Sequence, residues 1–506
     1  MDGAGFRSLI IFLLLAIFAF VAGSLASDDA QGALIPSALI LGAFFLIYLG
    51  KNCWILLFIA PIVLFYVPLP WLQSYPVADV VCAIVLCYML VLRMTGYINL
   101  KWKGFLLLDI ATLLLFLYMA ASWVRNPVTV RAFVSITDYG DAQVGGKEYL
   151  FFVGAVFSYI AVSLVQVKME LLLKVLKWAF WIAVFLASFY IVKGVIGGTV
   201  VFGDQMTNSR YSTFVPVAQP LYSYLLSKYS LVCIFMSPVK IIFLVATLAA
   251  ILLGGYRTFS VNAVFFVYIV SVFHKQLVFL IILSLASWGG LIYLSQQEGV
   301  MDAVPYGIRR TLTIVPCVEF TEQALNNDVK SSTEWRVEMW KWALDPSKGY
   351  IDDYVWGDGY GLSYHNMQWQ GVLVGLNLRQ GGDNELFAET GSWHNAAISV
   401  LQHLGAVGVG LVFIWYVAAV YLVYIVCISM RGWLGSEYVY VILCPIVTSA
   451  FTFWFLPGDM SNVFKLCSQI AMAKLLYSSL IEKAAVLPLF GQKVYVPQIM
   501  RASSFE

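Results

Sequence analysis

Residues 396–429 have the sequence AAISVLQHLGAVGVGLVFIWYVAAVYLVYIVCIS, which contains no Asp, Glu, Lys or Arg. A helix that crosses the hydrocarbon core of a bilayer needs about 20 largely apolar residues. This stretch exceeds that length, so it predicts a transmembrane helix. The residues just before it, His394 and Asn395, would then lie at the membrane surface.

Similar apolar stretches recur along the whole chain of 506 residues. Hydrophobic residues make up 61% and charged residues 11%, whereas charged residues are about 25% of a soluble domain. So few polar groups cannot cover a soluble surface, and a net charge of +2 gives no excess for binding nucleic acid. We therefore exclude a soluble enzyme, a disordered chain and a nucleic-acid-binding protein. Fourteen stretches are candidate spans: 8–26, 33–50, 53–70, 77–95, 104–124, 148–166, 171–192, 220–237, 239–256, 258–273, 276–294, 396–429, 437–457 and 462–481.

The sequence thus predicts an all-α polytopic membrane protein with about 12–14 transmembrane helices. Residues 1–294 form the N-terminal transmembrane bundle, and residues 295–393 form one large loop that contains short helices. Residues 394–506 hold the C-terminal transmembrane helices and a cytoplasmic tail.

The Lys and Arg residues of the short loops predict the orientation, because such residues concentrate on the cytoplasmic side. With the N-terminus inside, the inner loops hold Lys51, Arg93, Lys101, Lys103, Lys168, Lys240, Lys275 and Arg431. Both termini are then cytoplasmic, and the 295–393 loop is periplasmic in a bacterial inner membrane. That loop has 7 basic and 14 acidic residues, so its arginines are not simply a solubilising excess.

The loop contains a Trp-rich amphipathic stretch. Ser331 and Glu334 have the spacing of a capping box, and Pro346 should end the helix, which predicts a helix over 331–344. Arg336 and Trp340 share one of its faces at i and i+4. Such a helix should lie on the membrane interface or cover a cavity. The structural alternative is a packing helix with a solvated arginine.

Glycines and histidines mark the end of the loop. Gly357 and Gly359 indicate a tight turn or a close approach of the backbone to another group. His394 lies where the polar loop enters the membrane, and imidazole titrates near neutral pH, which suits proton transfer. The alternative is a hydrogen-bonded structural histidine.

Three arginines belong to separate segments that are all expected on the outer side: Arg210, Arg257 and Arg336. An arginine near the membrane interior is costly and usually has a partner or a function. Guanidinium groups bind phosphate oxygens in a bidentate manner. No Cys-x-x-Cys pair or Cys/His cluster indicates a metal, and nothing indicates a cofactor. The pattern predicts a site for a lipid diphosphate with a histidine as proton acceptor.

From Arg257 to Gly408, the chain resembles the O-antigen ligase and polymerase superfamily. The resemblance covers roughly residues 200–430 and rests on these motifs in order: Gly-Tyr-Arg257-Thr, Ser331-Ser-Thr-Glu-Trp-Arg336-x-x-x-Trp340, Gly357-x-Gly359, His394-Asn395 and Leu-Gly405-x-x-Gly408.

The resemblance implies metal-independent, inverting transfer of a glycan from undecaprenyl diphosphate to an acceptor hydroxyl at the periplasmic face. It implies that Arg257 and Arg336, with Arg210 less sharply placed, bind the diphosphate and that His394 takes the proton. His365-Asn366 is a second His-Asn pair, so the base remains open between His365 and His394. His394 is preferred because Leu-Gly-x-x-Gly follows it.

Other functions remain open. Ligation onto a lipid core and polymerisation of a glycan chain fit equally well. A transporter or flippase of lipid-linked oligosaccharides is a different class, which predicts mid-membrane charges and broken helices. A metal-dependent membrane glycosyltransferase is a third class, which would use the acidic pair Asp28-Asp29, but the Trp-Trp-Asp string of that class is absent.

The charge asymmetry predicts that residues 295–393 face the periplasm. A single cysteine engineered into this segment should react with a thiol reagent that does not cross the inner membrane, in cells whose inner membrane is intact. Labelling that appears only after the inner membrane is opened would contradict this orientation.

Overall fold

The computed structural model describes part of the chain, and every structural statement below concerns that part. The described residues are 46–62, 66–69, 72–128, 143–144, 147–196, 212–297, 300, 304–312, 315, 323–360, 362–363, 393–456 and 458–482. The predicted spans at 8–26 and most of 33–50 lie outside them, as do the candidate residues Arg210 and His365.

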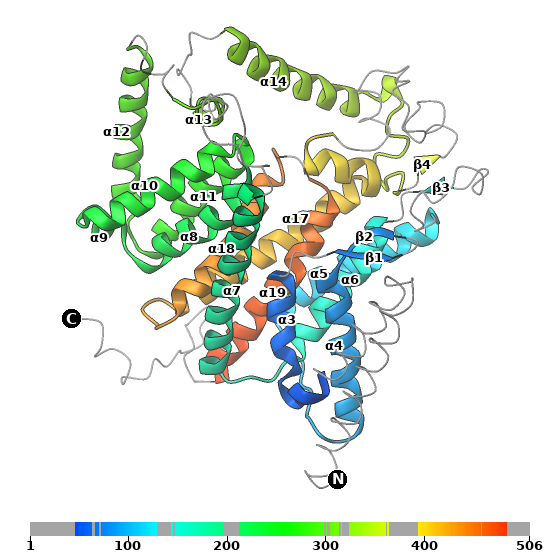
Figure 1. Ribbon diagram of the computed structural model, residues 1–506. Coiled ribbons are helices and arrows are strands. Elements are labelled where there is room, and N and C mark those ends of the chain that lie inside the picture. The colour runs from blue at the N-terminus through cyan, green and yellow to red at the C-terminus, as the bar shows by residue number, and fades with distance from the viewer. Residues whose placement is uncertain are drawn as a thin grey trace, which may run out of the picture.

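Ten predicted apolar stretches are helices with bounds close to those expected (Figure 1). Long runs of apolar residues with good helix propensity explain most of them, although the 437–457 stretch contains Pro445 and the 396–429 stretch has a non-helical backbone at Gly405. These helices are α4 (Val77–Met94), α5 (Leu106–Arg125), α6 (Lys147–Ser163), α7 (Met169–Ile196), α10 (Pro238–Leu253), α11 (Arg257–Phe273), α12 (Leu277–Ser295), α17 (Ala396–Ser429), α18 (Ser436–Thr452) and α19 (Met460–Glu482).

Two other predicted spans are not continuous helices. The stretch 53–70 contains η1 (Gly50–Ile55), α3 (Leu56–Ile59), η2 (Ala60–Ile62) and the strand β1 (Tyr66–Leu69). Prolines at 61, 68 and 70 explain this break, since proline removes a backbone donor. The stretch 220–237 is divided between α8 (Val215–Lys228), which follows η5 (Ser212–Phe214), and α9 (Leu231–Phe235). Ser230 separates α8 from α9, because its side chain accepts a hydrogen bond from the backbone of Cys233 and caps α9.

Four of the described helices are long and apolar enough to cross a membrane: α5, the first part of α7, α12 and α17. Five further apolar stretches are shorter, at 10–17 residues. Seventeen residues of helix extend only about 26 Å, less than the hydrocarbon thickness of about 30 Å. The four long helices support a helical membrane protein, while the total of about 12–14 spans stays a prediction.

Two short antiparallel ladders depart from the all-α expectation. The strand β1 pairs with β2 (Leu72–Pro76). The strand β3 (Gln143–Val144) pairs with β4 (Leu362–Ser363), which joins the segment after α5 to the predicted loop.

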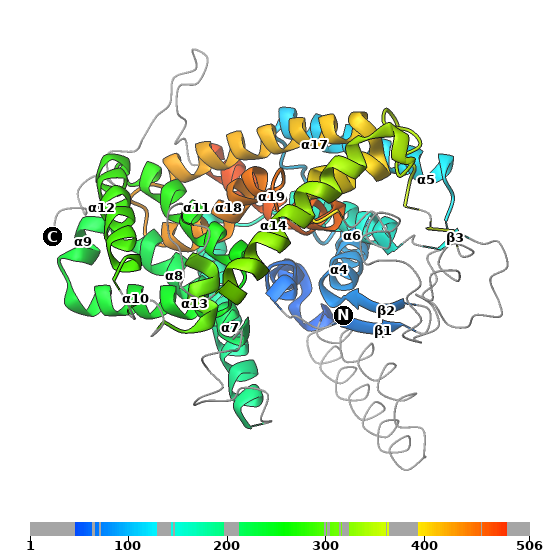
Figure 2. The ribbon, with the colours of Figure 1, turned by 90° about the horizontal axis from the view of Figure 1, so that it is seen from above.

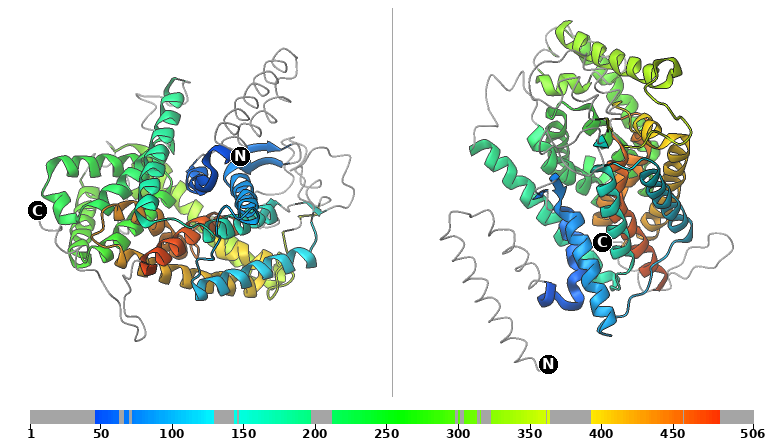
Figure 3. Two further views of the ribbon diagram at one scale, coloured as in Figure 1. Left: turned by 90° about the horizontal axis from the view of Figure 1, so that it is seen from below. Right: turned by 90° about the vertical axis from the view of Figure 1, so that its right-hand side faces the viewer.

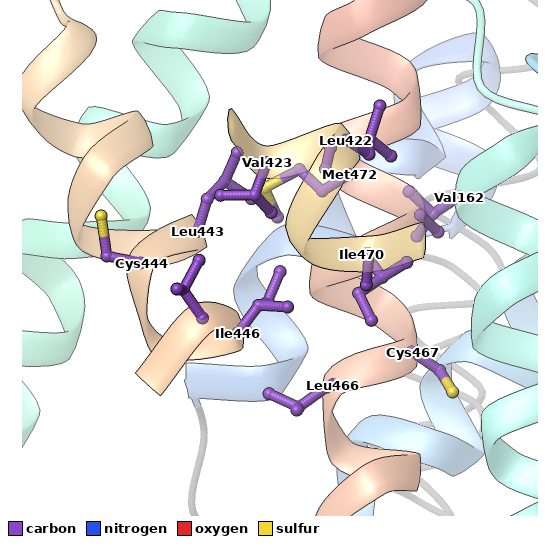
Figure 4. Close-up of a cluster of buried hydrophobic side chains, with 14 of the residues drawn as sticks. Val162, Leu422, Val423, Leu443, Cys444, Ile446, Leu466, Cys467, Ile470 and Met472 are labelled. Carbon is purple, nitrogen blue, oxygen red and sulfur yellow. The ribbon is translucent and has the colours of Figure 1, made fainter. Parts of the chain in front are cut away.

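The helices α17, α18 and α19 form the centre of the bundle. The helix α17 also packs against α5, and α19 packs against α6. Figure 4 shows Leu422 and Val423 of α17 close to Leu443 of α18 and Met472 of α19. All four side chains are buried in one continuous hydrophobic core.

The predicted loop helix exists but begins earlier than expected. The helix α14 spans Gln323–Leu344, so it starts eight residues before Ser331. The preceding residues include Gln, Ala, Leu and Lys, which are good helix formers, so the capping-box spacing does not mark the first turn. The helix ends as predicted, because η6 (Pro346–Lys348) follows at the proline. A shorter helix, α13 (Tyr306–Leu312), precedes it.

A buried polar network connects α5, α6 and α19. Lys474 of α19 is fully buried and forms an ion pair with Asp109 of α5. Its ammonium also donates to the hydroxyls of Tyr159 (3.0 Å) and Ser163 (2.9 Å) on α6 and lies 4.4 Å from the ring centre of Trp102. Tyr159 donates in turn to Asp109 at 2.7 Å. Because both charges have partners, the pair avoids the cost of an isolated buried ion.

We expect the substitution Lys474→Met to destabilise the protein strongly, since it leaves the carboxylate of Asp109 without its cation. The loss should be about 3–5 kcal/mol, whereas Ser163→Ala, which removes one hydrogen bond, should cost about 1 kcal/mol. Thermal unfolding of the purified variants measures the difference. The double variant Asp109→Leu/Lys474→Met should recover most of the loss, and equal unfolding midpoints for Lys474→Met and Ser163→Ala would contradict the assignment.

Candidate functional site

His394 is held at the N-terminus of α17 by its two neighbours. Asn395 is the N-cap, and its side-chain oxygen accepts hydrogen bonds from the backbone of Ala397 (3.0 Å) and Ile398 (3.2 Å). The amide nitrogen of Asn395 donates to the carbonyl of Trp454 at 2.8 Å. His394 itself has φ of 52°, a backbone conformation that is uncommon for a residue with a side chain. Asn395 is therefore the N-cap of α17, and it fixes the position of the preceding residue, His394.

Trp393 connects this helix start to α14. Its ring is fully buried, and its indole N–H donates to the side chain of Gln402 at 2.7 Å. Its carbonyl accepts a hydrogen bond of 2.9 Å from the indole of Trp340, which belongs to the motif Ser331-Ser-Thr-Glu-Trp-Arg336-x-x-x-Trp340. Met339 and Ala343 of α14 are buried in the same cluster. The tryptophans of α14 thus dock the helix on the residue that precedes His394.

Docking in this way brings two residues of α14 to His394. The rings of Trp335 and His394 are edge to face, with their centres 5.0 Å apart. Burial, and then the positive charge of Arg336, lower the pKa of the His394 imidazole from its ordinary value. Both effects disfavour the imidazolium form and favour the neutral imidazole. A neutral imidazole is the form that accepts a proton.

Arg336 has a second basic neighbour that the sequence did not single out. Burial, and then the charge of Arg310 on α13, lower the pKa of the Arg336 guanidinium. Arginine nevertheless stays charged at any physiological pH. The Nε atom of Arg336 is buried and has no hydrogen-bond partner within the described residues. In the sequence, the two consecutive arginines Arg309 and Arg310 in an otherwise acidic segment could have indicated this neighbour.

Arg257 lies at the turn between α10 and α11. It is the first residue of α11 and follows Gly255, which has a left-handed φ of 67°. The helix α13 packs against both α10 and α11, and Arg310 donates to the carbonyl of Gly255 at 3.5 Å. Arg310 therefore contacts the turn that carries Arg257, and its charge lowers the pKa of Arg336 on α14.

Gly357 and Gly359 have a structural explanation. The helix α17 is interrupted at Gly405, which has φ of 64° and ψ of −175°. Gly357 approaches the interruption so closely that a Cβ atom there would overlap the backbone of Leu404 and Gly405. Gly359 has φ of 79°, and a Cβ atom on it would lie 2.7 Å from Cβ of Asn126. The glycines thus permit the close approach that the sequence predicted: Gly357 approaches the broken helix, and Gly359 approaches Asn126.

The segment before Tyr360 supplies the hydrogen bonds that α17 lacks at its interruption. Backbone bonds join Asp358 N–H to Gln402 C=O (2.7 Å), Gly359 N–H to His403 C=O (2.9 Å), Ala406 N–H to Tyr354 C=O (2.8 Å) and Val407 N–H to Val355 C=O (3.2 Å). In an unbroken helix, the Ala406 and Val407 donors would bond to Gln402 and His403. An inserted stretch of loop therefore replaces two helical hydrogen bonds with four bonds of its own.

Two residues of α5 fix this inserted stretch, and neither was predicted from the sequence. The hydroxyl oxygen of Tyr118 lies 2.9 Å from the carbonyl oxygen of Trp356 and 2.8 Å from that of Leu404, so its single proton is shared between the two acceptors. Arg125 donates to the carbonyls of Trp356 (2.7 Å) and Gly357. Tyr118 lies inside an apolar run, where nothing in the sequence indicates a role for its hydroxyl. Arg125 ends the same run. In the sequence, a basic residue at a span end that is expected on the outer side could have indicated its role.

His403 belongs to the same structural unit. Its ring is buried, its Nδ1 lies 2.8 Å from the carbonyl of Gly359, and it stacks on Tyr360 with ring centres 4.3 Å apart. His403 therefore supports the inserted loop, which separates its role from that of half-exposed His394.

Among the described residues, no group of three or more His, Cys, Asp or Glu side chains is arranged to hold a metal ion. A scan against protein-family models finds no match for this chain, and a search of curated proteins finds none either.

The contact between Gly357 and the interruption predicts that Gly357→Ala is far more damaging than Gly349→Ala. Both glycines have a left-handed φ, at 77° and 67°, but a Cβ atom on Gly349 would meet nothing within 4 Å. The Gly349 variant should lose about 1 kcal/mol from backbone strain alone, and the Gly357 variant should lose about 1–3 kcal/mol more from overlap. Thermal unfolding of both variants tests this. Equal losses of stability in the two variants would mean that the backbone at Gly405 shifts to accommodate the added methyl group at little cost.

Proposed function

We propose that this chain is a glycan transferase of the bacterial inner membrane, which moves a glycan from an undecaprenyl-diphosphate donor to an acceptor hydroxyl. The reaction would be metal-independent and inverting, and it would occur at the periplasmic face. The observation that supports this most is the position of His394 beside the half-buried Arg336, whose charge, after burial, lowers the pKa of the imidazole. A base beside a strong anion-binding group is what this reaction requires.

The proposed reaction has one nucleophile and one leaving group. The acceptor oxygen attacks the anomeric carbon of the donor, and the bond from that carbon to the diphosphate oxygen breaks. The diphosphate leaves with the electron pair, and His394 accepts the proton of the acceptor hydroxyl. Attack opposite to the leaving group inverts the anomeric configuration. Arg336 and Arg257 would stabilise the charge that develops on the departing diphosphate.

The nearness of Arg336 to His394 couples these two roles. In the free enzyme, the guanidinium disfavours protonation of His394 and keeps the base neutral. A diphosphate bound at Arg336 would offset that positive charge, so His394 would become a stronger base once the donor is present. Donor binding would thus prepare the base for the acceptor.

A transporter or flippase of lipid-linked oligosaccharides remains the second candidate, because the structure contains features of that class. The helix α17 is discontinuous at Gly405, and Asp109 and Lys474 form an ion pair between helices. In transporters, such helix ends line a cavity for the substrate. Here the inserted loop occupies the interruption, and both charges have protein partners. These features therefore favour a structural role, and ligation and polymerisation remain equal within the transferase class.

The decisive experiment replaces His394. We expect His394→Ala to lower glycan transfer by about 10²–10⁴-fold, the usual contribution of a general base, while binding of the lipid-linked donor persists. Turnover is measured with purified enzyme in nanodiscs and excess chelator. Near-normal turnover in this variant would overturn the role of His394. If His365→Ala abolishes transfer instead, the base is His365 of the other His-Asn pair.

His403→Ala is the matched control, because it removes a buried histidine nine residues further along the chain. We expect it to lower the unfolding temperature, since it removes the contacts with Gly359 and Tyr360. His394→Ala should leave the unfolding temperature almost unchanged.

The acid limb of the pH–rate profile tests the coupling between Arg336 and His394. The charge of Arg336 lowers the pKa of His394, so its removal in Arg336→Gln should raise that pKa and move the acid limb to higher pH. Arg336→Lys keeps the charge, and its acid limb should stay near that of the native enzyme even where its rate falls. Lys341→Gln removes an exposed charge from the same helix and should leave the profile in place. An acid limb that does not move in Arg336→Gln would show that another group controls the profile.

A further inference from the structure

An apolar groove lies on the surface of α11, between α12 and α18. Its volume is about 410 Å³, within the range of roughly 300–1,000 Å³ for sites that hold small molecules. The helix α11 lines the groove with five side chains between Val264 and Val272, and Leu277 of α12 and Phe451 of α18 complete it. Val264 and Phe451 are about half exposed, so the groove is open to the hydrocarbon around the bundle.

Two contacts fix the helices that form this groove. The hydroxyl of Tyr268 on α11 donates to Oγ of Ser284 on α12 at 2.9 Å. The rings of Phe265 on α11 and Phe451 on α18 are stacked, with their centres 5.7 Å apart. Figure 2 shows α12 at the edge of the bundle with α11 and α18 next to it, and the left-hand view of Figure 3 shows the green helices of this region together on one side. The groove is therefore a formed feature of the lipid-facing surface.

The groove occupies one half of α11. Arg257 is the first residue of this helix, and the lining begins at Val264 and continues to Val272. Eight residues of helix extend about 12 Å, close to the depth of one leaflet at about 15 Å. In the predicted orientation, this half of α11 is the cytoplasmic half. The groove therefore matches the acyl chains of the inner leaflet and lies away from the proposed transfer site.

The groove ends at a turn that carries an exposed lysine. Lys275 lies between Val272 and Leu277 and has a left-handed φ of 57°. The backbone N–H of Gln276 bonds to the carbonyl of Ser271 at 2.8 Å, which closes the C-terminal end of α11. Glycine usually takes the left-handed position after a helix, because a side chain there costs conformational free energy. Such costs concentrate at functional sites, so Lys275 is a candidate for one.

Three contacts join this turn to neighbouring helix ends. Nε2 of His274 lies 3.2 Å from the carbonyl oxygen of Ser227, at the end of α8. The backbone N–H of Leu231, in α9, donates to the side chain of Gln276 at 2.6 Å. The ring of His274 also lies edge to face with that of Tyr440 on α18, with centres 6.1 Å apart. The ends of α8, α9, α11 and α18 therefore meet at the turn.

The segments that meet at the turn are basic. Residues 227–240, 273–277 and 428–440 contain four Lys or Arg residues and one acidic residue, namely Lys228, Lys240, Lys275, Arg431 and Glu437. Basic residues on the cytoplasmic side of membrane helices attract anionic lipid headgroups. The apolar groove and the basic turn are thus complementary to the two parts of an anionic lipid.

We propose that the groove and the turn form a site for one anionic phospholipid of the inner leaflet, with an acyl chain in the groove and the phosphate group at Lys275. The ammonium of Lys275 would form a charge-assisted hydrogen bond with the phosphate. A zwitterionic phospholipid offers the same chain but no net negative charge, so the site would select by headgroup. This site goes beyond the proposed transfer function and does not depend on it.

The test titrates the purified full-length protein in detergent with phosphatidylglycerol and phosphatidylcholine that have identical acyl chains, and measures bound lipid by native mass spectrometry. The native protein should prefer phosphatidylglycerol. Lys275→Asn suits the left-handed backbone and should weaken phosphatidylglycerol binding about fivefold, the effect of one basic residue at an anionic lipid surface. Phosphatidylcholine binding should hardly change. Lys101→Gln, which removes an exposed lysine from another loop on the same predicted face, should alter neither affinity.

A second pair of variants tests the groove. Val272→Trp places bulk in the groove and should weaken binding of both lipids, whereas Val245→Trp adds the same bulk to an exposed residue of α10 outside the groove and should weaken neither. Equal affinities of the native protein for the two lipids would overturn the proposal. So would an unchanged phosphatidylglycerol affinity in Lys275→Asn, an equal loss in Lys101→Gln, or unchanged binding of both lipids in Val272→Trp.

Discussion

A helix that is interrupted among apolar surroundings exposes backbone donors and acceptors that lipid cannot satisfy. The helix α17 has this difficulty at Gly405, and residues 354–359 resolve it by bonding to both sides of the interruption. Gly357 permits the approach, and Tyr118 and Arg125 hold the inserted stretch from α5. A polar loop and an apolar helix therefore form one structural unit. The backbone donors and acceptors of each are hydrogen-bonded only when the other is in place.

This unit determines where the candidate site can form. The part of α17 before the interruption is short, and its direction is set at one end by the inserted loop and at the other by the tryptophan contacts between Trp393 and α14. His394 lies at the end of α17 that α14 contacts. Arg336 is therefore near His394 because α14 packs there. Arg257 and Arg310 belong to α11 and α13, which pack with α10 as a separate group of helices. The site thus depends on how three parts of the fold meet.

Much of the helical framework could be predicted from sequence, because long apolar runs such as 104–124 and 462–481 form helices regardless of their partners. The approach of Gly357 to a neighbouring backbone was also predictable, since alternate glycines have few other uses. The interruption at Gly405 was not, because glycine is common in membrane helices and the φ of 64° depends on the inserted loop. The roles of Tyr118 and Arg310 depend on contacts between distant segments, which periodicity cannot reveal. Arg210 and His365 lie outside the described residues, so their predicted roles stay predictions.

The order of residues along the chain gives the interruption in α17 a consequence for biogenesis. A polypeptide emerges from the ribosome N-terminus first, at about 5–20 residues per second, so residues 354–359 are made before Gly405. The partner that satisfies the broken helix therefore exists before the helix does. α5, which fixes that partner, is synthesised earlier still, whereas α18 and α19 are synthesised later. α17 can thus complete its hydrogen bonds as it enters the bundle, without waiting for the C-terminal helices.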